Sequence, residues 1–246
     1  MYFYRIYHGP DTLMKVRFND IVVYHKRDKD ADLGRTTTNS ANDLLFTGEN
    51  SLTIEIVDGA EHHPVFVDLN VDYERTVKRV DWPGLWEALP EGQRVLPMVH
   101  TAHFDITEDF ERPAFLNAPK SDFGPEGNPE LREAVRKFHD AVDRCDLDSY
   151  CESLDLKSEE LLRSYNNHSD FTIDGARQEA AGFFQQNPRT RPLDFDELVF
   201  ESCRGGQVAY VRRVDGGKAI ESVGAETELS TDLWLTRHRA EWKIFR

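Results

Sequence analysis

The spacing of apolar residues changes near Asn128, and this change constrains the fold more than any other feature of the sequence. Before it, short runs rich in Val, Ile, Tyr, Phe and Thr end at Asn, Asp, Gly or Pro. After it, apolar residues recur at steps of three and four. The first pattern predicts β-strands and the second predicts helices. With 246 residues, the chain is long enough for two domains, so we expect an α+β protein built from two parts.

Residues 1–112 are predicted to form an antiparallel β-sandwich. The strand-like runs in this part are YFYRIY, TLMKVRF, IVVYH, SLTIEIV, VFVDLNV and VHTAHFDI. The pair Asn19 and Asp20 separates two of them and tolerates positive φ, which predicts a tight hairpin. The run at residues 82–89, WPGLWEAL, indicates a helical turn. The sequences VRFNDIVVY and GENSLTIEI resemble the jelly-roll or immunoglobulin-like β-sandwich modules that accompany many bacterial enzymes.

Residues 113–128 concentrate Pro, Gly and Asn without periodicity, so we expect a linker there. Beyond it, residues 129–246 are predicted to form a second domain. Asn128 should cap its first helix, with Pro129 at the first helical position. We expect a second helix from near Ser158 and a third after Asp174 as its N-cap. Four or five strands should follow from Leu198 onward.

The second domain resembles the cone-shaped α+β fold of the nuclear transport factor family and its polyketide-cyclase-like relatives. The resemblance rests on FHDAVDRCDLDSYCESL, which includes Asp146, Asp148 and Tyr150, and on the ending WLTRHRAEWKIF. It implies three helices packed on a curved antiparallel sheet. Isomerases, cyclases, dehydratases and non-enzymatic binding domains share this fold, so the resemblance leaves the function open.

The chain carries 45 acidic and 30 basic residues, a formal net charge of -15. This charge argues against a nucleic-acid partner and favours a protein with a basic contact face, although solubility alone is an alternative explanation. No apolar run approaches the roughly 20 residues that cross a membrane. Three cysteines without a CxxC pair and no secretory signal lead us to expect a cytoplasmic location and no membrane association.

Four carboxylates crowd the corner between the first two helices, namely Asp143, Asp146, Asp148 and Glu152. Arg144 is the only obvious basic neighbour in the sequence, so this corner is the candidate contact surface for a basic partner. A solvated corner without function is the alternative interpretation.

Two other groups of residues are candidates for chemistry. His168 and Asp170 could form a general base with its orienting carboxylate, or simply a polar loop. Asp28, Asp30 and Asp32 alternate as in a Ca²⁺ loop, but the Gly and Glu of an EF-hand are missing, and a solvated hairpin loop is the alternative. Other patterns that indicate a metal or a cofactor are absent from the sequence, so no cofactor is expected.

The sequence therefore favours a non-enzymatic cytoplasmic binding protein, such as a bacterial toxin-neutralising immunity protein. The alternative is a cone-fold enzyme or small-molecule binder with a pocket in the second domain. In that case an acid or base has to point into the cavity, and His139 is expected to face outward because it follows the core residue Phe138. A third hypothesis is carbohydrate binding by the sandwich, with Tyr73, Trp82 and Trp86 as stacking faces.

Overall fold

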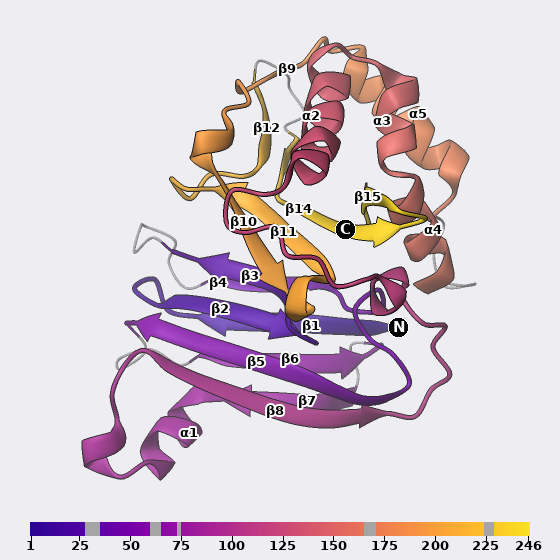
Figure 1. Cartoon of the computed structure of the whole chain (residues 1–246). Helices are drawn as coiled ribbons and strands as arrows, with labels where there is room; N and C mark the ends of the chain where they lie inside the picture. The colour runs from indigo at the N-terminus through magenta and orange to yellow at the C-terminus, as the bar shows by residue number, and fades with distance from the viewer. Residues whose placement is uncertain (28–34, 60–64, 73–74, 165–170, 224–228) are drawn as a thin grey trace. The chain divides into compact units, whose positions relative to one another are not determined.

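The computed structural model describes residues 1–27, 35–59, 65–72, 75–164, 171–223 and 229–246 (Figure 1). Within these residues the protein is a mixed α+β fold with four antiparallel sheets and five α-helices. Its internal contacts divide the chain into two compact units, Met1–Arg112 and Pro113–Arg246. The α+β class expected from the sequence is confirmed, and independent folding of the two units stays a prediction.

The first unit contains two four-stranded antiparallel sheets, with strand orders β4-β1-β6-β7 and β3-β2-β5-β8. Its elements are β1 (Tyr2–His8), β2 (Leu13–Phe18), β3 (Ile21–Lys26), β4 (Arg35–Ser40), β5 (Gly48–Asp58), β6 (Phe66–Val71), β7 (Arg75–Asp81), α1 (Trp82–Ala88), the 3₁₀ turn η1 (Glu91–Gln93) and β8 (Met98–Ile106). Helix α1 confirms the helical turn expected at residues 82–89.

The two sheets of the first unit repeat one connection pattern. Raising each strand number by four, and counting on from β8 to β1, converts the pairs β1·β4, β1·β6 and β2·β3 into β5·β8, β5·β2 and β6·β7, and all of these pairs are antiparallel. The unit is thus two four-stranded halves that exchange strands between the sheets. This order differs from the immunoglobulin arrangement of sheets ABED and CFG.

Buried and more exposed residues alternate along the strands, so one face of each sheet lies in the core of the first unit. In β1 the residues Tyr4 and Ile6 are buried, and in β2 the residues Met14, Val16 and Phe18 are buried. The rings of Tyr4 and Phe18, one from each sheet, lie 5.4 Å apart. This is the packing that a period of two produces when one face of each sheet is apolar.

The predicted hairpin at Asn19 and Asp20 is confirmed. Their φ angles are 51° and 66°, and they join β2 to β3. Asn19 also donates from Nδ2 to the carbonyl of Leu44 at 2.8 Å, which fixes the turn against the next segment. Asn and Asp tolerate the left-handed region, and this tolerance allows the two-residue turn.

The second unit contains four α-helices, one more than expected, and two sheets. Its elements are η2 (Ala114–Asn117), α2 (Pro129–Asp143), α3 (Leu147–Ser153), α4 (Asp155–Ser164), α5 (Ile173–Phe184), β9 (Arg189–Thr190), η3 (Phe195–Glu197), β10 (Leu198–Cys203), η4 (Arg204–Gly206), β11 (Val208–Arg213), β12 (Ile220–Val223), β13 (Ser230–Thr231), β14 (Leu233–His238) and β15 (Glu241–Ile244). The main sheet has the order β10-β11-β14-β15, and the small one has the order β13-β12-β9.

Local capping explains where the helices begin. Asn128 accepts a hydrogen bond from the backbone N–H of Leu131 at 2.9 Å, which confirms it as the N-cap of α2. The expected N-cap of the third helix was wrong, because Thr172 rather than Asp174 caps α5. Its hydroxyl accepts from the N–H of Gly175 at 3.0 Å, so the helix begins two residues earlier. Helix α4 likewise begins at Asp155, before Ser158.

Helices and the main sheet share one core. The apolar stripe of α2 supplies Leu131, Val135, Phe138 and Val142, and these residues pack with buried side chains of β10, β11, β14 and β15. Helices α2 to α5 lie together in the part of Figure 1 that contains this sheet. Apolar residues spaced three and four apart form a stripe along a helix, and this apolar face can pack against a sheet.

The segment 113–128, expected to be a linker, contributes to the second unit. Phe115, Ala118 and Phe123 are buried. The rings of Phe115 and Phe245 lie 5.5 Å apart, and Gln207 donates from Nε2 to the carbonyl of Ala118 at 2.8 Å. These contacts place the division between the units before this segment, at Arg112 and Pro113.

Candidate functional site

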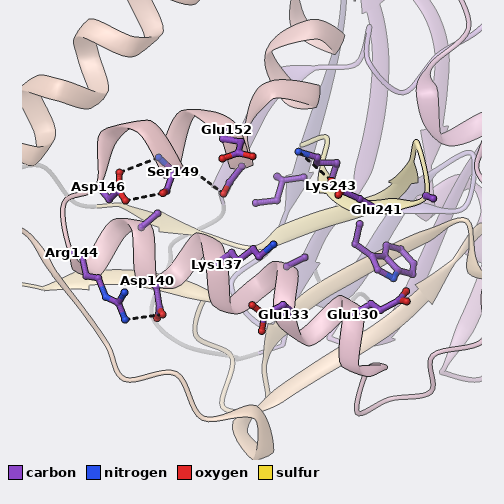
Figure 2. A pocket seen from close by; sticks show the side chains of 16 residues that line it. Glu130, Glu133, Lys137, Asp140, Arg144, Asp146, Ser149, Glu152, Glu241 and Lys243 are labelled. Carbon is purple, nitrogen blue, oxygen red and sulfur yellow. Dashed lines mark hydrogen bonds and ion pairs between the residues drawn. The ribbon is translucent and has the colours of Figure 1, made fainter.

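A groove of about 630 Å³ lies in the second unit where α2, α3 and β15 meet (Figure 2). We call it the acidic groove. It is lined by Glu130, Glu133, Ala134, Lys137, Asp140, Ala141, Arg144, Asp146, Ser149, Glu152, Ser153, Ala240, Glu241, Trp242, Lys243 and Ile244.

Helix α2 forms the first wall of the acidic groove. Glu130, Glu133, Lys137, Asp140 and Arg144 follow one another at steps of three and four, so they share one face of the helix. Arg144 donates to Asp140 at 3.2 Å, four residues back. Lys137 makes no hydrogen bond or ion pair within the described chain.

The other two carboxylates of this wall have basic partners outside the groove lining. Arg136 pairs with Glu133 at 2.5 Å, and Arg237 from β14 pairs with Glu130. The Glu133 and Arg136 side chains are both about half exposed, with relative exposures of 49%. Exposed ion pairs contribute roughly 0–1 kcal/mol, so an incoming cation can compete with Arg136 for Glu133 at small cost.

Helix α3 forms the second wall. Asp146 is its N-cap and accepts hydrogen bonds from the N–H and the hydroxyl of Ser149, at 3.1 and 2.8 Å. These hydrogen bonds hold the pKa of Asp146 below its ordinary value, so it is ionised at neutral pH. Glu152 is exposed, and no other described residue forms a hydrogen bond or ion pair with it.

Strand β15 lies between the two walls. Glu241 and Lys243 lie on it, and Lys243 donates to Asp155 of α4 at 3.2 Å. Trp242 and Ile244 are buried at 5% and 3% exposure and belong to the core under α2. The strand therefore contributes both charged and apolar residues to the lining.

The lining has an excess of negative charge. Six of its side chains are carboxylates and three are cationic, a formal excess of three negative charges. Because a hollow has low-dielectric walls, the field of these carboxylates is focused into it rather than dispersed in water. The acidic groove can thus attract and hold a positively charged group.

The structure distributes the four predicted corner carboxylates over two places. Asp146 and Glu152 line the acidic groove, whereas Asp143 and Asp148 are absent from its lining. Asp143 accepts from the N–H and hydroxyl of Thr190, both at 3.0 Å. Asp148 pairs with Arg177 of α5. The corner thus has more basic neighbours than Arg144 alone.

Sequence reasoning missed Glu130, Glu133, Asp140 and Glu241. The first three could have been found, because they follow the helical repeat of α2 on the face opposite its apolar stripe. Glu241 gave no such signal, since it lies about 100 residues away in a strand whose partner is set by the sheet order.

His139 faces inward, so the expectation that it faces solvent was wrong. Its side chain is 11% exposed, and its Nε2 lies 2.8 Å from the hydroxyl of Thr190. That hydroxyl donates to Asp143, so Nε2 donates to the hydroxyl. The cause is β9, whose Thr190 covers this side of α2, a contact that helical periodicity alone does not reveal.

The other candidate residues either lie outside the described part of the chain, where they stay predictions, or belong to the described part. Asp28, Asp30, Asp32, His168 and Asp170 lie outside the described residues, as does Tyr73. Trp82 is only 1% exposed, so its ring offers no face to a sugar.

Aromatic side chains of α2, α3 and α5 pack against one another in the core of the second unit. The rings of Phe138 and Tyr150 lie 5.5 Å apart and nearly parallel, and Tyr150 meets Phe184 edge to face at 5.3 Å. Burial raises the pKa of Tyr150 above its ordinary value, as expected for a phenol among apolar neighbours. None of these three residues lines the acidic groove.

The described residues contain no group of three His, Cys, Asp or Glu side chains that could hold a metal ion. Across the same residues, no helix is both long and apolar enough to cross a membrane. The whole chain matches no protein-family model and is not significantly similar to any curated protein or solved structure.

Proposed function

We propose that this chain is a non-enzymatic binding protein that holds a basic protein partner in the acidic groove. The observation that carries the proposal is the convergence of six carboxylates from two helices and a strand on one hollow of about 630 Å³. The net charge of -15 adds a long-range attraction for such a partner. Attraction of this kind raises the association rate more than the affinity.

A bacterial toxin-neutralising immunity protein fits this description. Such a protein acts in the cytoplasm, needs no chemistry of its own and has to capture its toxin quickly. We further propose that the second unit is a cone-shaped domain of the nuclear transport factor type, used here for binding. The order of helices followed by the antiparallel strands β10, β11, β14 and β15 supports this assignment.

The alternative is a cone-fold enzyme or small-molecule binder. It requires an open interior with an ionisable group, and the mutual contacts of Phe138, Tyr150 and Phe184 argue against such an interior. His139, the one histidine of α2, is engaged with Thr190 and Arg191 instead of facing a hollow.

A neutralisation assay tests the proposal. Each protein encoded beside this gene is produced in a bacterial host, alone and together with this chain. We expect one of them to arrest growth and this chain to restore it. If none arrests growth, or none is neutralised, the immunity assignment is wrong.

The contribution of the acidic groove is tested with two matched variants. Glu133→Lys with Glu152→Lys reverses one charge on each wall, and Glu179→Lys with Asp196→Lys makes the same change in net charge at exposed positions outside the groove. We expect the groove variant to associate with the partner at least tenfold more slowly at low salt and the control to lose much less. If both variants lose the same association rate, the net charge of the chain controls association and the acidic groove does not.

A further inference from the structure

Strand β8 is an outer strand of the sheet β3-β2-β5-β8 in the first unit, and hydrogen bonds of its neighbour β5 show which of its backbone groups are free (Figure 1). Asn19, which follows β2, donates from its N–H to the carbonyl of Ser51 at 2.9 Å, and the N–H of Ser51 donates to the side chain of Asn19 at 2.9 Å. Both backbone groups of Ser51 therefore face β2. Because successive residues of a strand turn their backbone groups to opposite sides, those of Leu52 and Ile54 face β8.

The pairing of β5 with β8 carries this alternation across to β8, because it is regular over nine consecutive residue pairs. Leu52 lies opposite Ala102, and Ile54 lies opposite His100. Ala102 and His100 therefore direct their N–H and C=O groups to β5. The residues that alternate with them direct theirs to the outer edge of the sheet, and they are Val99, Thr101, His103 and Asp105.

These four residues are also exposed, so another molecule can reach the outer edge of β8. Val99 is 59% exposed, the side chain of His103 is 61% exposed, and Thr101 and Asp105 are exposed as well. Within the described residues, no strand pairs with this edge, and no hydrogen bond to its outward backbone groups is found. A strand of this length spans roughly 30 Å.

The edge lacks most of the features that keep strand edges from pairing. Strand β8 contains no lysine and no proline, and its register with β5 shows no bulge. Proteins usually shorten, bulge or cover an outer strand, or place lysine or proline on it, because an open edge accepts further strands. A regular, open edge is where an extended segment of another protein can be added to a sheet.

The exposed side chains of this edge change from apolar to acidic along the strand. Val99 lies near one end, where Val57 of β5 is also exposed. Near the other end, Glu49 and Asp105 lie directly opposite each other, and within the described residues only His103 pairs with either of them, at 3.6 Å from Glu49. Like charges directly opposite on neighbouring strands are destabilising, so this end favours the approach of a cation.

We infer that a partner protein adds an extended antiparallel strand to the outer edge of β8, with a lysine or arginine opposite Asp105 and an apolar residue opposite Val99. This surface belongs to the first unit, so the inference goes beyond the proposed function, which uses the acidic groove. Backbone hydrogen bonds along the edge supply the pairing. The two carboxylates and the exposed valines select the direction and the register of the added strand.

A second copy of this chain does not fit this pattern. Two antiparallel copies of β8 bring residues with outward backbone groups opposite one another. The register that pairs all four of them places Val99 opposite Asp105 and Thr101 opposite His103, so neither copy supplies a lysine or arginine to the acidic end. Two chains of charge -15 also repel each other. The edge therefore fits a different chain with a basic residue.

The experiment uses the full chain and a synthetic peptide, Lys-Thr-Thr-Thr-Val-Thr-Val. In the proposed register its odd positions face β8, with the lysine opposite Asp105. Two N-methylated forms are matched controls for each other. Methylation at positions 3 and 5 removes N–H donors that face β8, and methylation at positions 2 and 4 removes donors that face away. Binding and amide hydrogen exchange are followed by nuclear magnetic resonance at low salt.

Two variants of the chain form a second matched pair. Thr101→Pro removes an outward N–H and blocks an added strand, whereas Thr101→Ala keeps that N–H. Both variants lose the hydroxyl that lies 2.9 Å from the hydroxyl of Thr53. In the free wild-type chain, we expect the amides of Thr101 and His103 to exchange faster than that of Ala102. The peptide should slow exchange at Thr101 and His103 at least tenfold and change Ala102 little.

Methylation at positions 3 and 5 and the variant Thr101→Pro should each weaken peptide binding at least tenfold. Methylation at positions 2 and 4 and the variant Thr101→Ala should change it less than threefold. Glu49→Gln with Asp105→Asn should weaken binding at least threefold, because it removes both carboxylates from the acidic end. If Thr101→Pro does not fold, the methylated peptides and the charge variant decide.

Three results would overturn the inference. The unmodified peptide does not bind, the two methylated peptides bind equally well, or Thr101→Pro folds and binds the peptide as the wild type does. A dimer of the free chain that Thr101→Pro separates would show that a second copy occupies the edge, which also contradicts the inference. None of these variants changes a residue of the acidic groove, so the proposed function stands or falls separately.

Discussion

The two units of this protein pair their charges differently. In the first unit, an acid and a base of neighbouring strands lie together on one face, as Arg17 and Glu55 do at 3.2 Å, and the sheet itself sets their distance. In the second unit, carboxylates from α2, α3 and β15 converge on one groove, and Glu152 has no basic partner within the described chain. The sheet pairs these charges locally, whereas a surface that binds a basic partner, as we propose for the acidic groove, keeps some of its charges unpaired.

The largest expected effect concerns the division between the units. A fragment of residues 113–246 should fold, whereas a fragment of residues 129–246 should not. The shorter fragment loses the buried rings of Phe115 and Phe123, and each such loss costs about 3–5 kcal/mol against a typical total of 5–15 kcal/mol. Circular dichroism and thermal unfolding of both fragments test this. A stable 129–246 fragment would mean that residues 113–128 are a linker after all.

The next largest expected effect is a difference in stability between two variants. Each variant breaks one ion pair, one in each unit. Glu160 is buried, pairs with Arg163 and accepts from the N–H of Ala114 at 3.0 Å. Glu160→Ala leaves a buried cation and a backbone donor without this acceptor, which should cost about 3–5 kcal/mol. Glu55→Ala removes the more exposed partner of Arg17 and should cost about 1 kcal/mol or less.

Chemical denaturation of both variants at neutral pH measures the difference. Equal losses would contradict the view that burial determines how much an ion pair contributes to stability. Glu160→Gln serves as the conservative control, because an amide oxygen can still accept from Ala114.

The third effect is a pH dependence that arises from one carboxylate of the second unit, Asp143. Hydrogen bonds from the N–H and hydroxyl of Thr190 hold the pKa of Asp143 below its ordinary value. A depressed carboxyl pKa adds stability above the unfolded value, and this stability is lost as the pH falls through the folded value. In Asp143→Asn, the free energy of unfolding should therefore fall less on acidification below about pH 4. Urea unfolding between pH 2 and 7 tests this, and parallel curves for the variant and the wild type would contradict it.

The sequence could predict the parts of this structure that depend on local rules. The hairpin at Asn19 and Asp20, the cap of α2 at Asn128 and helix α1 all follow from residues close together in the chain. Alternation in residues 1–112 predicted strands, but the exchange of strands between two sheets is a property of the topology, and no local pattern encodes it.

The candidate site shows the same limit. Two of its carboxylates, Asp146 and Glu152, were predicted because they crowd one stretch of sequence. The position of Glu241 beside them depends on β15 being the outer strand, and this follows only from the order β10-β11-β14-β15. Likewise, the burial of His139 depends on β9, which lies 50 residues away in sequence and is only two residues long.

The smallest expected effect tests whether repulsion among the carboxylates of the acidic groove lowers the stability of the free protein. Glu152 lies among carboxylates of like charge and has no basic partner in the described chain, so neutralising it should relieve repulsion. Glu152→Gln should raise the free energy of unfolding by about 0.2–0.5 kcal/mol at low salt. The gain should disappear at high salt, where the Debye length falls to about 3 Å.

Glu179→Gln is the matched control, because Glu179 is an exposed carboxylate of α5 that does not line the groove. It should leave the unfolding free energy within about 0.2 kcal/mol, as surface changes usually do. The same Glu152→Gln variant should bind the basic partner more weakly than wild type. A residue that lowers the stability of the protein but strengthens partner binding contributes to binding at the expense of stability. Loss of stability in Glu152→Gln would instead assign Glu152 a structural role and remove it from the binding surface.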